Sequence, residues 1–425
     1  MIQRIVAIGF IFASMTVAWL ILGATVKFRT HEQDTKLKNA VGQLWGSAQI
    51  QKTPTAYWTT REIVQRGEGG QVVQQTVEKK RAIPLESSRV DVDLQLEHRR
   101  KGLLWYATYR VAFAGTFTIA NETDQPQETH IDFALPDPDA VYDDFNVSIG
   151  GEKVSAPPIV SGHLVQPVHL PPGAQQTVRI SYKSQGLDEW RYSFGDDINQ
   201  VSDFALAMRT DFEAIDFPQH SMSPTLKEHV QGGWKLEWRY DHLLTGVDVG
   251  MSMPHRLNPG PWTSQVSFAA PVSLFLFFFL FFIFSTVKGV KIHPMNYFFI
   301  GAAFFSFHLL LAYLVDHISI HRAFAISSAV SILLVISYMR LVVGLRLALV
   351  EVGLSQFVYL VLFSYTFFFE GYTGLAITLL CIVTLFATMQ FTGRVDWEAI
   401  FQQGPETDAP ATRHAYSART PKKEL

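Results

Sequence analysis

The chain combines long apolar runs with one long polar stretch. A helix needs about 20 apolar residues to cross the hydrocarbon core of a bilayer, and residues 5–26 supply the first such run. From residue 267 onward there are five more, separated by short links, and this excludes a soluble core as their explanation. The pattern therefore predicts one transmembrane helix at the start of the chain and a five-helix block at about 268–287, 295–315, 321–339, 353–369 and 374–391.

The first run permits two interpretations, an anchor or a secretory signal peptide. Its apolar core is longer than the about 7–15 residues typical of a signal peptide, and "LGAT" is a weak cleavage site. We therefore predict an uncleaved transmembrane helix over residues 1–26. Both interpretations send the segment that follows to the other side of the membrane.

The spacing of apolar residues within the polar stretch changes along its length. In residues 27–52, Leu37, Val41 and Leu44 recur at helical spacing and predict a juxtamembrane amphipathic helix that extends the first anchor. From about residue 53 the period becomes two, and "SRVDVDLQLE" places Val90 and Val92 alternately with polar residues, as in a half-buried strand. Further strand-like segments follow between turn-formers such as "PDPD" and "LPPGAQQ", without intervening amphipathic helices.

These elements predict an α+β membrane protein. The N-terminal transmembrane anchor precedes a large antiparallel β-rich domain over residues 53–266, with a sandwich-like arrangement of strands. The five-helix transmembrane block occupies residues 267–393. The tail, residues 394–425, lacks apolar periodicity and is expected to be a disordered cytoplasmic segment.

The positive charges of the short loops predict the orientation of the helices. With the N-terminus in the cytoplasm, Lys288, Lys291, Arg340 and Arg346 all fall on the inner side, whereas the two short outer loops hold Arg322 as their single fixed positive charge. Cytoplasmic loops carry an excess of Lys and Arg. We therefore expect both termini in the cytoplasm and the β-rich domain outside it.

Composition changes this picture little. A formal net charge of -3 gives no reason to expect nucleic acid as a partner. The single cysteine, Cys381, lies in an apolar run and excludes an intrachain disulfide or a multi-cysteine metal site. The expected partner of the apolar runs is the lipid bilayer. The sequence leaves the oligomeric state open and indicates no cofactor.

Several segments resemble a known family. "LWGSAQIQKTP" is similar to a stretch that follows the anchor in the CreD inner-membrane proteins, also called colicin-tolerance or cell-envelope-integrity proteins. "KIHPMNYFFIGAAFFSFHLLLAYL" resembles the His-Pro-Met signature of that family, "MQFTGRVDWEAI" its exit from the last helix, and "GGWKLEWRYDHL" one of its strands. The resemblance implies a bacterial inner-membrane protein tied to envelope integrity and stress response, and it supplies no catalytic residues.

The candidate functional residues all lie near the ends of the apolar runs. His293 precedes a proline, so it either starts a helix or binds a ligand, and Asn296 follows at the interfacial level. His317 and His321 are four apart near Asp316, which suits a metal on a helix but here crosses a loop. Arg340, Arg346 and Glu351 form either an ion-paired inner loop or part of an ion or proton pathway.

The polar domain offers weaker candidates. "GEGG" at residues 67–70 lacks the lysine and helix of a phosphate loop and predicts a hairpin turn. "HSMSP" and "DFEAIDFP" contain serine, histidine and aspartate without a nucleophile motif around them.

Three classes of function are compatible with these features. The favoured one is a non-enzymatic protein of the bacterial inner membrane whose outer domain is a binding module for an envelope or periplasmic protein. The alternative is a transporter or lipid-handling protein with a polar cavity lined by Asn296, Arg340, Arg346, Glu351 or Gln356. A membrane-embedded hydrolase would need a metal or a nucleophile.

Overall fold

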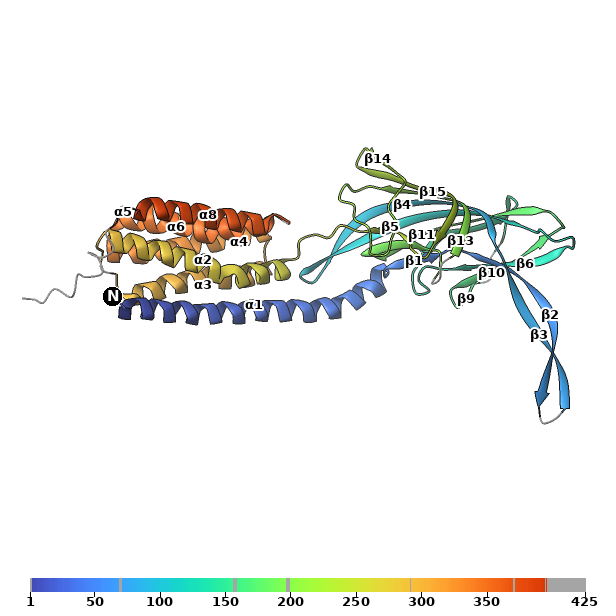
Figure 1. The fold of residues 1–425 in the computed structure, drawn as a ribbon, viewed down its shortest axis with the longest axis horizontal. Helices are drawn as coiled ribbons and strands as arrows, with labels where there is room; N and C mark the ends of the chain where they lie inside the picture. Colours follow the sequence, from blue (N-terminus) through green and yellow to red (C-terminus); the bar gives the residue numbers. More distant parts are fainter. Residues whose placement is uncertain are drawn as a thin grey trace, which may run out of the picture. The chain divides into compact units, whose positions relative to one another are not determined.

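The computed structural model describes residues 2–68, 71–155, 159–195, 199–290, 292–369, 371–393 and 395. The chain divides into two compact units. One comprises Met1–Lys27 and Gly260–Leu425, and the other comprises Phe28–Pro259. The first unit is helical and the second is built mainly of strands, as Figure 1 shows. This confirms the predicted α+β class.

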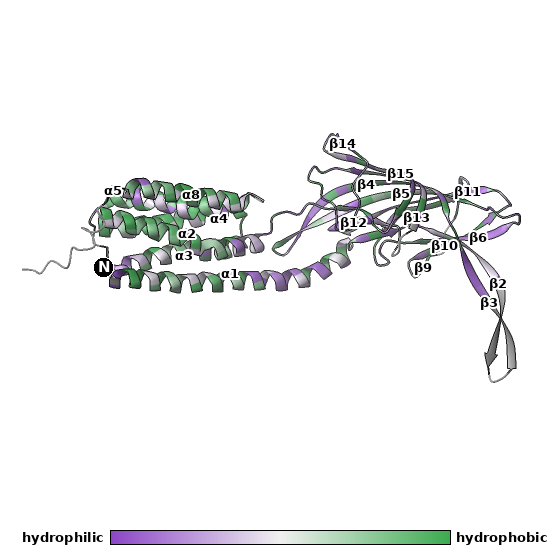
Figure 2. Cartoon of the chain, viewed as in Figure 1, coloured by the Kyte–Doolittle hydropathy of each residue, from purple (hydrophilic) through white to green (hydrophobic). Residues whose placement is uncertain are grey.

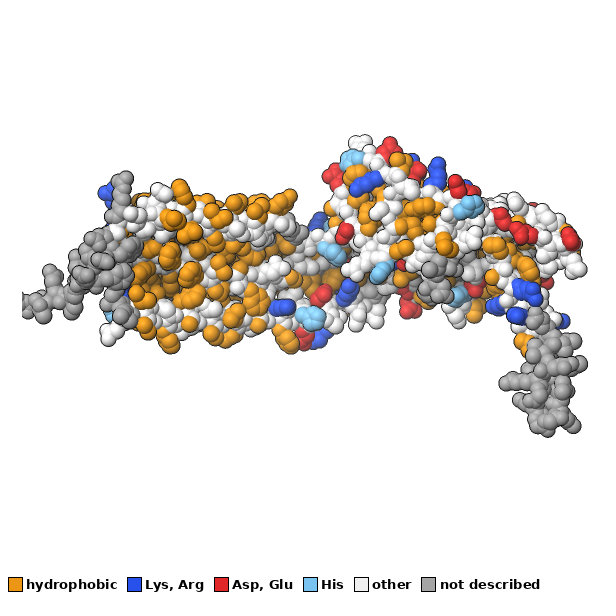
Figure 3. Space-filling model, in the orientation of Figure 1, with side chains coloured by type: hydrophobic (Ala, Val, Ile, Leu, Met, Phe, Trp, Pro, Cys, Tyr) orange, Lys and Arg blue, Asp and Glu red, His pale blue; other side chains and the backbone are white. Residues whose placement is uncertain are grey.

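Six helical spans of the described residues are long and apolar enough to cross a membrane (Figure 2). Within the helical unit, exposed side chains are largely apolar, as expected of a surface that faces lipid (Figure 3). Five of the spans are single helices: α1 (Ile2–Trp45), α2 (Pro259–Val287), α3 (Pro294–Leu314), α4 (Ile320–Val343) and α8 (Thr373–Thr392). The remaining span, which we call the composite span, consists of consecutive short helical segments: α5 (Leu345–Leu347), η1 (Ala348–Gly353), α6 (Leu354–Gln356), η2 (Phe357–Leu362), α7 (Phe363–Tyr365) and η3 (Thr366–Phe368).

The helix boundaries differ from those of the apolar runs. α1 continues without a break to Trp45, so the amphipathic helix extends the anchor as predicted, but it ends before residue 52. α2 begins at Pro259, before the apolar run at 268. The composite span starts at Leu345, so the expected inner loop shrinks to Gly344, whose φ is 86°. The length of an apolar run matches the thickness of the hydrocarbon core. A helix can continue beyond that run through polar residues until a glycine or proline ends it.

Aromatic side chains pack against one another at the centre of the helical unit. In α2, 56% of the apolar window is buried, against 17% in α1 and 11% in α8, so α2 lies at the centre of the unit. The Phe277 ring lies 4.9 Å from that of Phe304 in α3. At the other end of α2, the Trp262 indole donates to the carbonyl of Phe367 at 3.0 Å.

The β-rich unit contains three sheets. The order is β14-β15-β13-β4-β5-β11-β7-β8 in the large sheet, β3-β2-β6-β10-β9 in the second and β1-β12-β16 in the third. Most neighbours are antiparallel, but β13 pairs with β4 and β1 pairs with β12 in parallel, which the sequence pattern did not indicate. The strands are β1 (Gln49–Lys52), β2 (Thr55–Glu68), β3 (Gln71–Ile83), β4 (Leu85–Lys101), β5 (Leu104–Ala120), β6 (Gln127–Ala134), β7 (Tyr142–Ile149), β8 (Glu152–Lys153), β9 (Ile159–Val160), β10 (His163–Leu170), β11 (Gln175–Leu187), β12 (Glu189–Ser193), β13 (Asn199–Thr210), β14 (Leu226–Val230), β15 (Gly233–Thr245) and β16 (Val249–Ser252).

One hydrophobic core is shared by the three sheets. The predicted alternation in β4 is confirmed, because Val90, Val92 and Leu94 are all buried in it. Phe113 of the large sheet and Phe133 of the second lie 6.1 Å apart, which joins two layers. Each side chain of this size contributes about 1.5–3 kcal/mol when it is fully buried. The unit therefore has the core of an independent sandwich-like domain.

The two strands on either side of the predicted hairpin turn pair with each other. β2 and β3 pair antiparallel along their whole length, ending at Glu68 opposite Gln71. The turn residues 69–70 lie outside the described part of the chain, as do Lys291, Glu370, Arg394, Asp396 and the tail.

Candidate functional site

His293 caps a helix. Its Nδ1 accepts a hydrogen bond from the backbone N–H of Met295 at 3.2 Å, and Pro294 occupies the first position of α3. Asn296 lies one turn further in, where its side-chain oxygen accepts from the Tyr338 hydroxyl at 2.6 Å. The helix-start interpretation of His293 is therefore confirmed, and Asn296 joins α3 to α4.

The candidate metal ligands Asp316, His317 and His321 lie around the turn from α3 to α4. His317 is exposed in the turn, and the exposed His321 in the first turn of α4 stacks on Phe368, with 4.7 Å between ring centroids and 24° between planes. Asp316 is half-buried. In the part of the chain that the structure describes, no group of three or more His, Cys, Asp or Glu side chains could hold a metal ion.

The charged residues at the opposite end of α4 are also separated. Arg340 and Arg346 are exposed, whereas Glu351 forms an ion pair with Lys288, which follows the last residue of α2. The prediction that the two arginines and Glu351 pair within one inner loop is wrong, because these residues are helical and Glu351 meets another element instead. Exposed arginines at the ends of membrane helices can meet anionic headgroups.

A polar connection inside the helical unit joins three elements. Gln356 is completely buried and donates from Nε2 to the Ser331 hydroxyl at 2.9 Å, which in turn donates to the Ala303 carbonyl at 2.6 Å. Gln356 lies between two π-helical segments, a backbone irregularity that often occurs at functional sites. No sequence pattern singles out Ser331 as a candidate functional residue, because serine is common in membrane helices.

Several buried polar atoms of the helical unit have no hydrogen-bond partner among the described residues. They include Gln356 Oε1, the Ser327 hydroxyl and Nε2 of His308, all in buried side chains. The His308 ring packs edge-to-face against Trp19 of α1, with 5.5 Å between ring centroids. Buried polar groups are usually paired, so these positions are candidates for internal water.

The segment that carries one family resemblance enters the core of the β-rich unit. β1 lies parallel to β12, and its residues Gln49 and Gln51 are completely buried. Gln49 donates to the Gln185 carbonyl at 2.8 Å, and the Tyr182 hydroxyl donates to Gln51 Oε1 at 2.8 Å. Burial raises the pKa of Tyr182 well above its usual value, so the donor stays protonated. This segment is structural, since its polar side chains bond within the core.

The end of α1 docks on the same part of the β-rich unit. Val41 is completely buried in a cluster with Leu104 and Leu187, and Lys38 forms an ion pair with Asp188 at 2.6 Å. Leu44, predicted to share the apolar face, is 62% exposed, and Trp45 packs on the cluster instead. The helix thus enters the domain through a fixed hydrophobic contact.

An exposed surface of the second sheet combines aromatic, basic and acidic side chains. Tyr57 of β2 stacks on His130 of β6, with ring centroids 5.5 Å apart, while the Lys80 ammonium of β3 lies 4.2 Å from the centre of the Tyr57 ring. On the same face, His163 of β10 bonds to Asp132 at 2.8 Å. We call this surface the outer face; it consists of Tyr57, Thr59, Lys80, Glu128, His130, Asp132, His163, Pro167 and His169.

The opposite side of that sheet is part of the core. Ile131, Phe133, Leu164 and Val168 are buried there, whereas Thr59, Lys80, Pro167 and His169 on the outer face are exposed. Sequence reasoning did not find the outer face, because its residues come from four strands spread over more than a hundred positions. Only the strand register brings them together.

Six apolar helices and a separately folded β-rich unit define a polytopic membrane protein with a large domain outside the hydrocarbon core. The chain belongs to the CreD family: the model described as inner membrane protein CreD matches residues 1–199 and 268–398. It is therefore an inner-membrane protein of that family.

Comparisons with other proteins add little. The curated proteins give no match. Among solved structures, a Legionella pneumophila protein described as nutrient-binding is 12% identical, with a TM-score of 0.34 over 55% of this chain and 76% of that one. An M1 zinc metallopeptidase from Deinococcus radiodurans is also 12% identical, with a TM-score of 0.24 over 40% of this chain and 42% of its own. Likenesses this weak carry no argument about fold or function.

Proposed function

We propose that the β-rich unit is a periplasmic binding module for an envelope protein, held in the inner membrane by the six helical spans, and that it acts by binding and not by catalysis. The outer face is the observation that carries this proposal. It is an open sheet surface that carries aromatic, basic and acidic side chains close together, while the opposite side of the same sheet is part of the core. A role in envelope integrity or stress response would then follow from what the module binds.

The orientation is supported by the charges at the helix ends. Lys288, Arg340 and Arg346 lie at one end of the helical spans, and Arg322 lies at the start of α4, near the other end. The positive-inside rule then places the first group in the cytoplasm. Because α1 runs from the membrane unit into the β-rich unit, that domain would be periplasmic.

The outer face suits a protein partner better than a sugar. β2 lies between β3 and β6, so Lys80 and His130 flank Tyr57 from opposite sides. The Tyr57 ring is thus occupied within the domain and is not a free stacking platform. Exposed Thr59, Lys80 and His169 remain available for polar contacts and charge pairs with a folded surface.

The alternative function, transport or lipid handling through a polar cavity, has less support. Of its five proposed lining residues, Arg340 and Arg346 are exposed and Glu351 pairs with Lys288 after α2. Asn296 and Gln356 both bond to α4, through Tyr338 and Ser331.

Photocrosslinking in living cells tests the proposed binding module. We expect a p-benzoylphenylalanine at Thr59 or His169 to give the same single protein adduct, because both positions lie on the outer face. A matched probe at Leu226 on β14, which is 51% exposed, should not give it. Lys80→Glu should lower the adduct yield at Thr59 at least about fivefold, since one reversed charge at an interface typically costs about 1 kcal/mol or more. Equal adducts at all three positions, or none, would contradict the proposal.

A further inference from the structure

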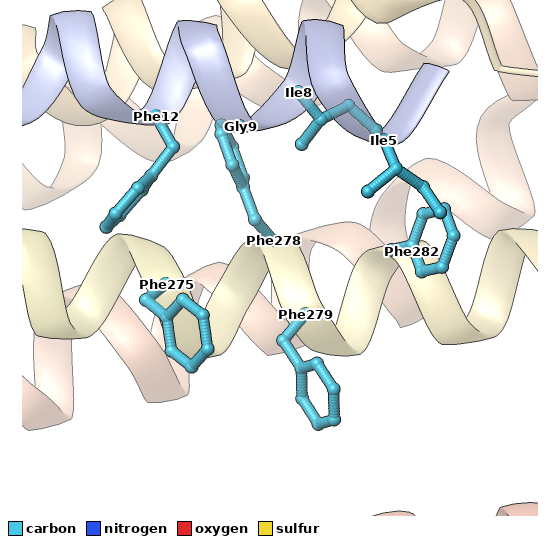
Figure 4. Close-up of a pocket in the computed structure, with 8 residues that line it drawn as sticks. All are labelled: Ile5, Ile8, Gly9, Phe12, Phe275, Phe278, Phe279 and Phe282. Atoms are coloured by element: carbon cyan, nitrogen blue, oxygen red, sulfur yellow. The ribbon is translucent and has the colours of Figure 1, made fainter. Parts of the chain in front are cut away.

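An apolar groove runs between α1 and α2 inside the membrane unit. Its volume is about 240 Å³, and Figure 4 shows Ile5, Ile8 and Phe12 of α1 facing phenylalanines of α2. The Phe12 and Phe275 rings meet edge-to-face at 6.0 Å between centroids. The groove is lined by Ile5, Ile8, Gly9, Phe12, Phe275, Phe278, Phe279 and Phe282.

The space at Gly9 is not needed for helix packing. A Cβ at this position would meet nothing within 4 Å, unlike the one at Gly23, which would lie 3.0 Å from the Phe268 ring. Glycine inside a helix costs about 1 kcal/mol relative to alanine. Gly9 therefore leaves an open stretch along α1 where the two helices do not fill the space between them.

The groove opens toward the medium around the helices. Ile5, Phe275 and Phe279 are 44%, 54% and 39% exposed, whereas Phe278 is buried between the helices. These residues lie within apolar spans of α1 and α2, so the surrounding medium is lipid hydrocarbon. The volume is below that of a typical small-molecule pocket and suits part of one acyl chain.

A positive charge lies at one end of this groove. The Arg4 guanidinium carbon is 5.6 Å from the centre of the Phe282 ring, which lines the groove, and one of its nitrogens donates to Ser285 at 3.1 Å. Arg4 makes no ion pair with any described carboxylate, and its Nε has no hydrogen-bond partner among the described residues. Lys288, one turn beyond Ser285, has its charge matched by Glu351.

An apolar groove with an arginine at one end suits an acyl chain that carries an anionic group. Arg4 lies in the first turn of α1, where the helix dipole adds to its positive potential. Arginine binds phosphate well, because its planar guanidinium offers several donors. We propose that the groove binds one acyl chain of an anionic phospholipid whose phosphate pairs with Arg4, independently of what the outer face binds.

Native mass spectrometry of the full-length protein tests this proposal. The protein would be released from micelles that contain phosphatidylglycerol and phosphatidylcholine in equal amounts. We expect wild type to keep one phosphatidylglycerol in preference to phosphatidylcholine by about tenfold. Gly9→Leu, which fills the groove, should reduce this retention at least about fivefold. Arg4→Gln should keep the retained lipid but lose the preference for phosphatidylglycerol.

The matched control is Gly374→Leu. Gly374 lies in the exposed face of α8, and its Cβ would also meet nothing within 4 Å. This variant should retain lipid like wild type, and the thermal midpoints of all variants would be measured to confirm folding. If wild type retains the two lipids equally, or if folded Gly9→Leu retains as much phosphatidylglycerol as Gly374→Leu, the groove holds only bulk lipid and the proposal is wrong.

Discussion

Gly46→Ala is expected to destabilise the β-rich unit by about 2–4 kcal/mol, because two costs act at one position. Gly46 has a φ of +91°, a conformation that L side chains rarely adopt. A Cβ there would lie 2.2 Å from the carbonyl oxygen of Gln185. That contact cannot relax by rotating a side chain, because the obstructing atom belongs to the backbone of β11. The measurement is the thermal midpoint of the purified full-length protein, together with the rate at which protease cleaves the β-rich unit.

Gly42→Ala is the matched control for this prediction. Gly42 lies one helical turn earlier in α1, and a Cβ there would meet nothing within 4 Å. Alanine favours a helix over glycine by about 1 kcal/mol, so this variant should be as stable as wild type or slightly more. If both variants were equally stable, the entry of β1 into the core would not be fixed at Gly46.

Gln356→Glu is expected to produce the largest loss within the membrane unit. The substitution places an ionisable group where the side chain is completely buried among apolar spans. A charge at the centre of a membrane helix costs about 2.5–3.5 kcal/mol on insertion scales. Folded yield from membranes and the thermal midpoint would measure this loss.

Gln356→Leu removes the hydrogen bond to Ser331 without introducing a charge, so it measures the contribution of that bond alone. The Ser331 hydroxyl keeps the Ala303 carbonyl as its acceptor, and the unpaired Oε1 of Gln356 disappears. Replacing a partly satisfied polar group by an apolar one of similar size is nearly neutral or stabilising, so we expect a change below about 1 kcal/mol. A loss as large as that of the glutamate variant would show that the hydrogen bond itself holds α4 against the composite span.

The sequence predicts the parts of this fold that rest on periodicity. Six apolar runs give six spans, since each must match the hydrocarbon thickness, and Val90 to Leu94 alternate because one face of β4 meets the core. The sequence predicts the positions of the helix ends less well. α1 continues to Trp45 because its last turns dock on Leu104 and Leu187, residues far away in the chain.

The site residues show the same limit. His293 could be interpreted correctly, because a helix cap is a local feature formed with Met295. Glu351 could not, because its partner Lys288 is 63 positions away, and the nearer Arg340 and Arg346 were the natural choice from sequence. The outer face depends on the register of four strands, which no local pattern specifies.

We propose that the helices anchor a periplasmic β-rich domain in the inner membrane, and cysteine labelling measures this orientation. In a Cys381→Ser background, single cysteines would replace Thr59 on the outer face, His317 in the turn after α3 and Arg346 at the opposite end of α4; all three positions are exposed. A membrane-impermeant maleimide should label the first two in intact spheroplasts and the third only after the membrane is permeabilised. Labelling of Arg346→Cys alone in intact spheroplasts would contradict the account.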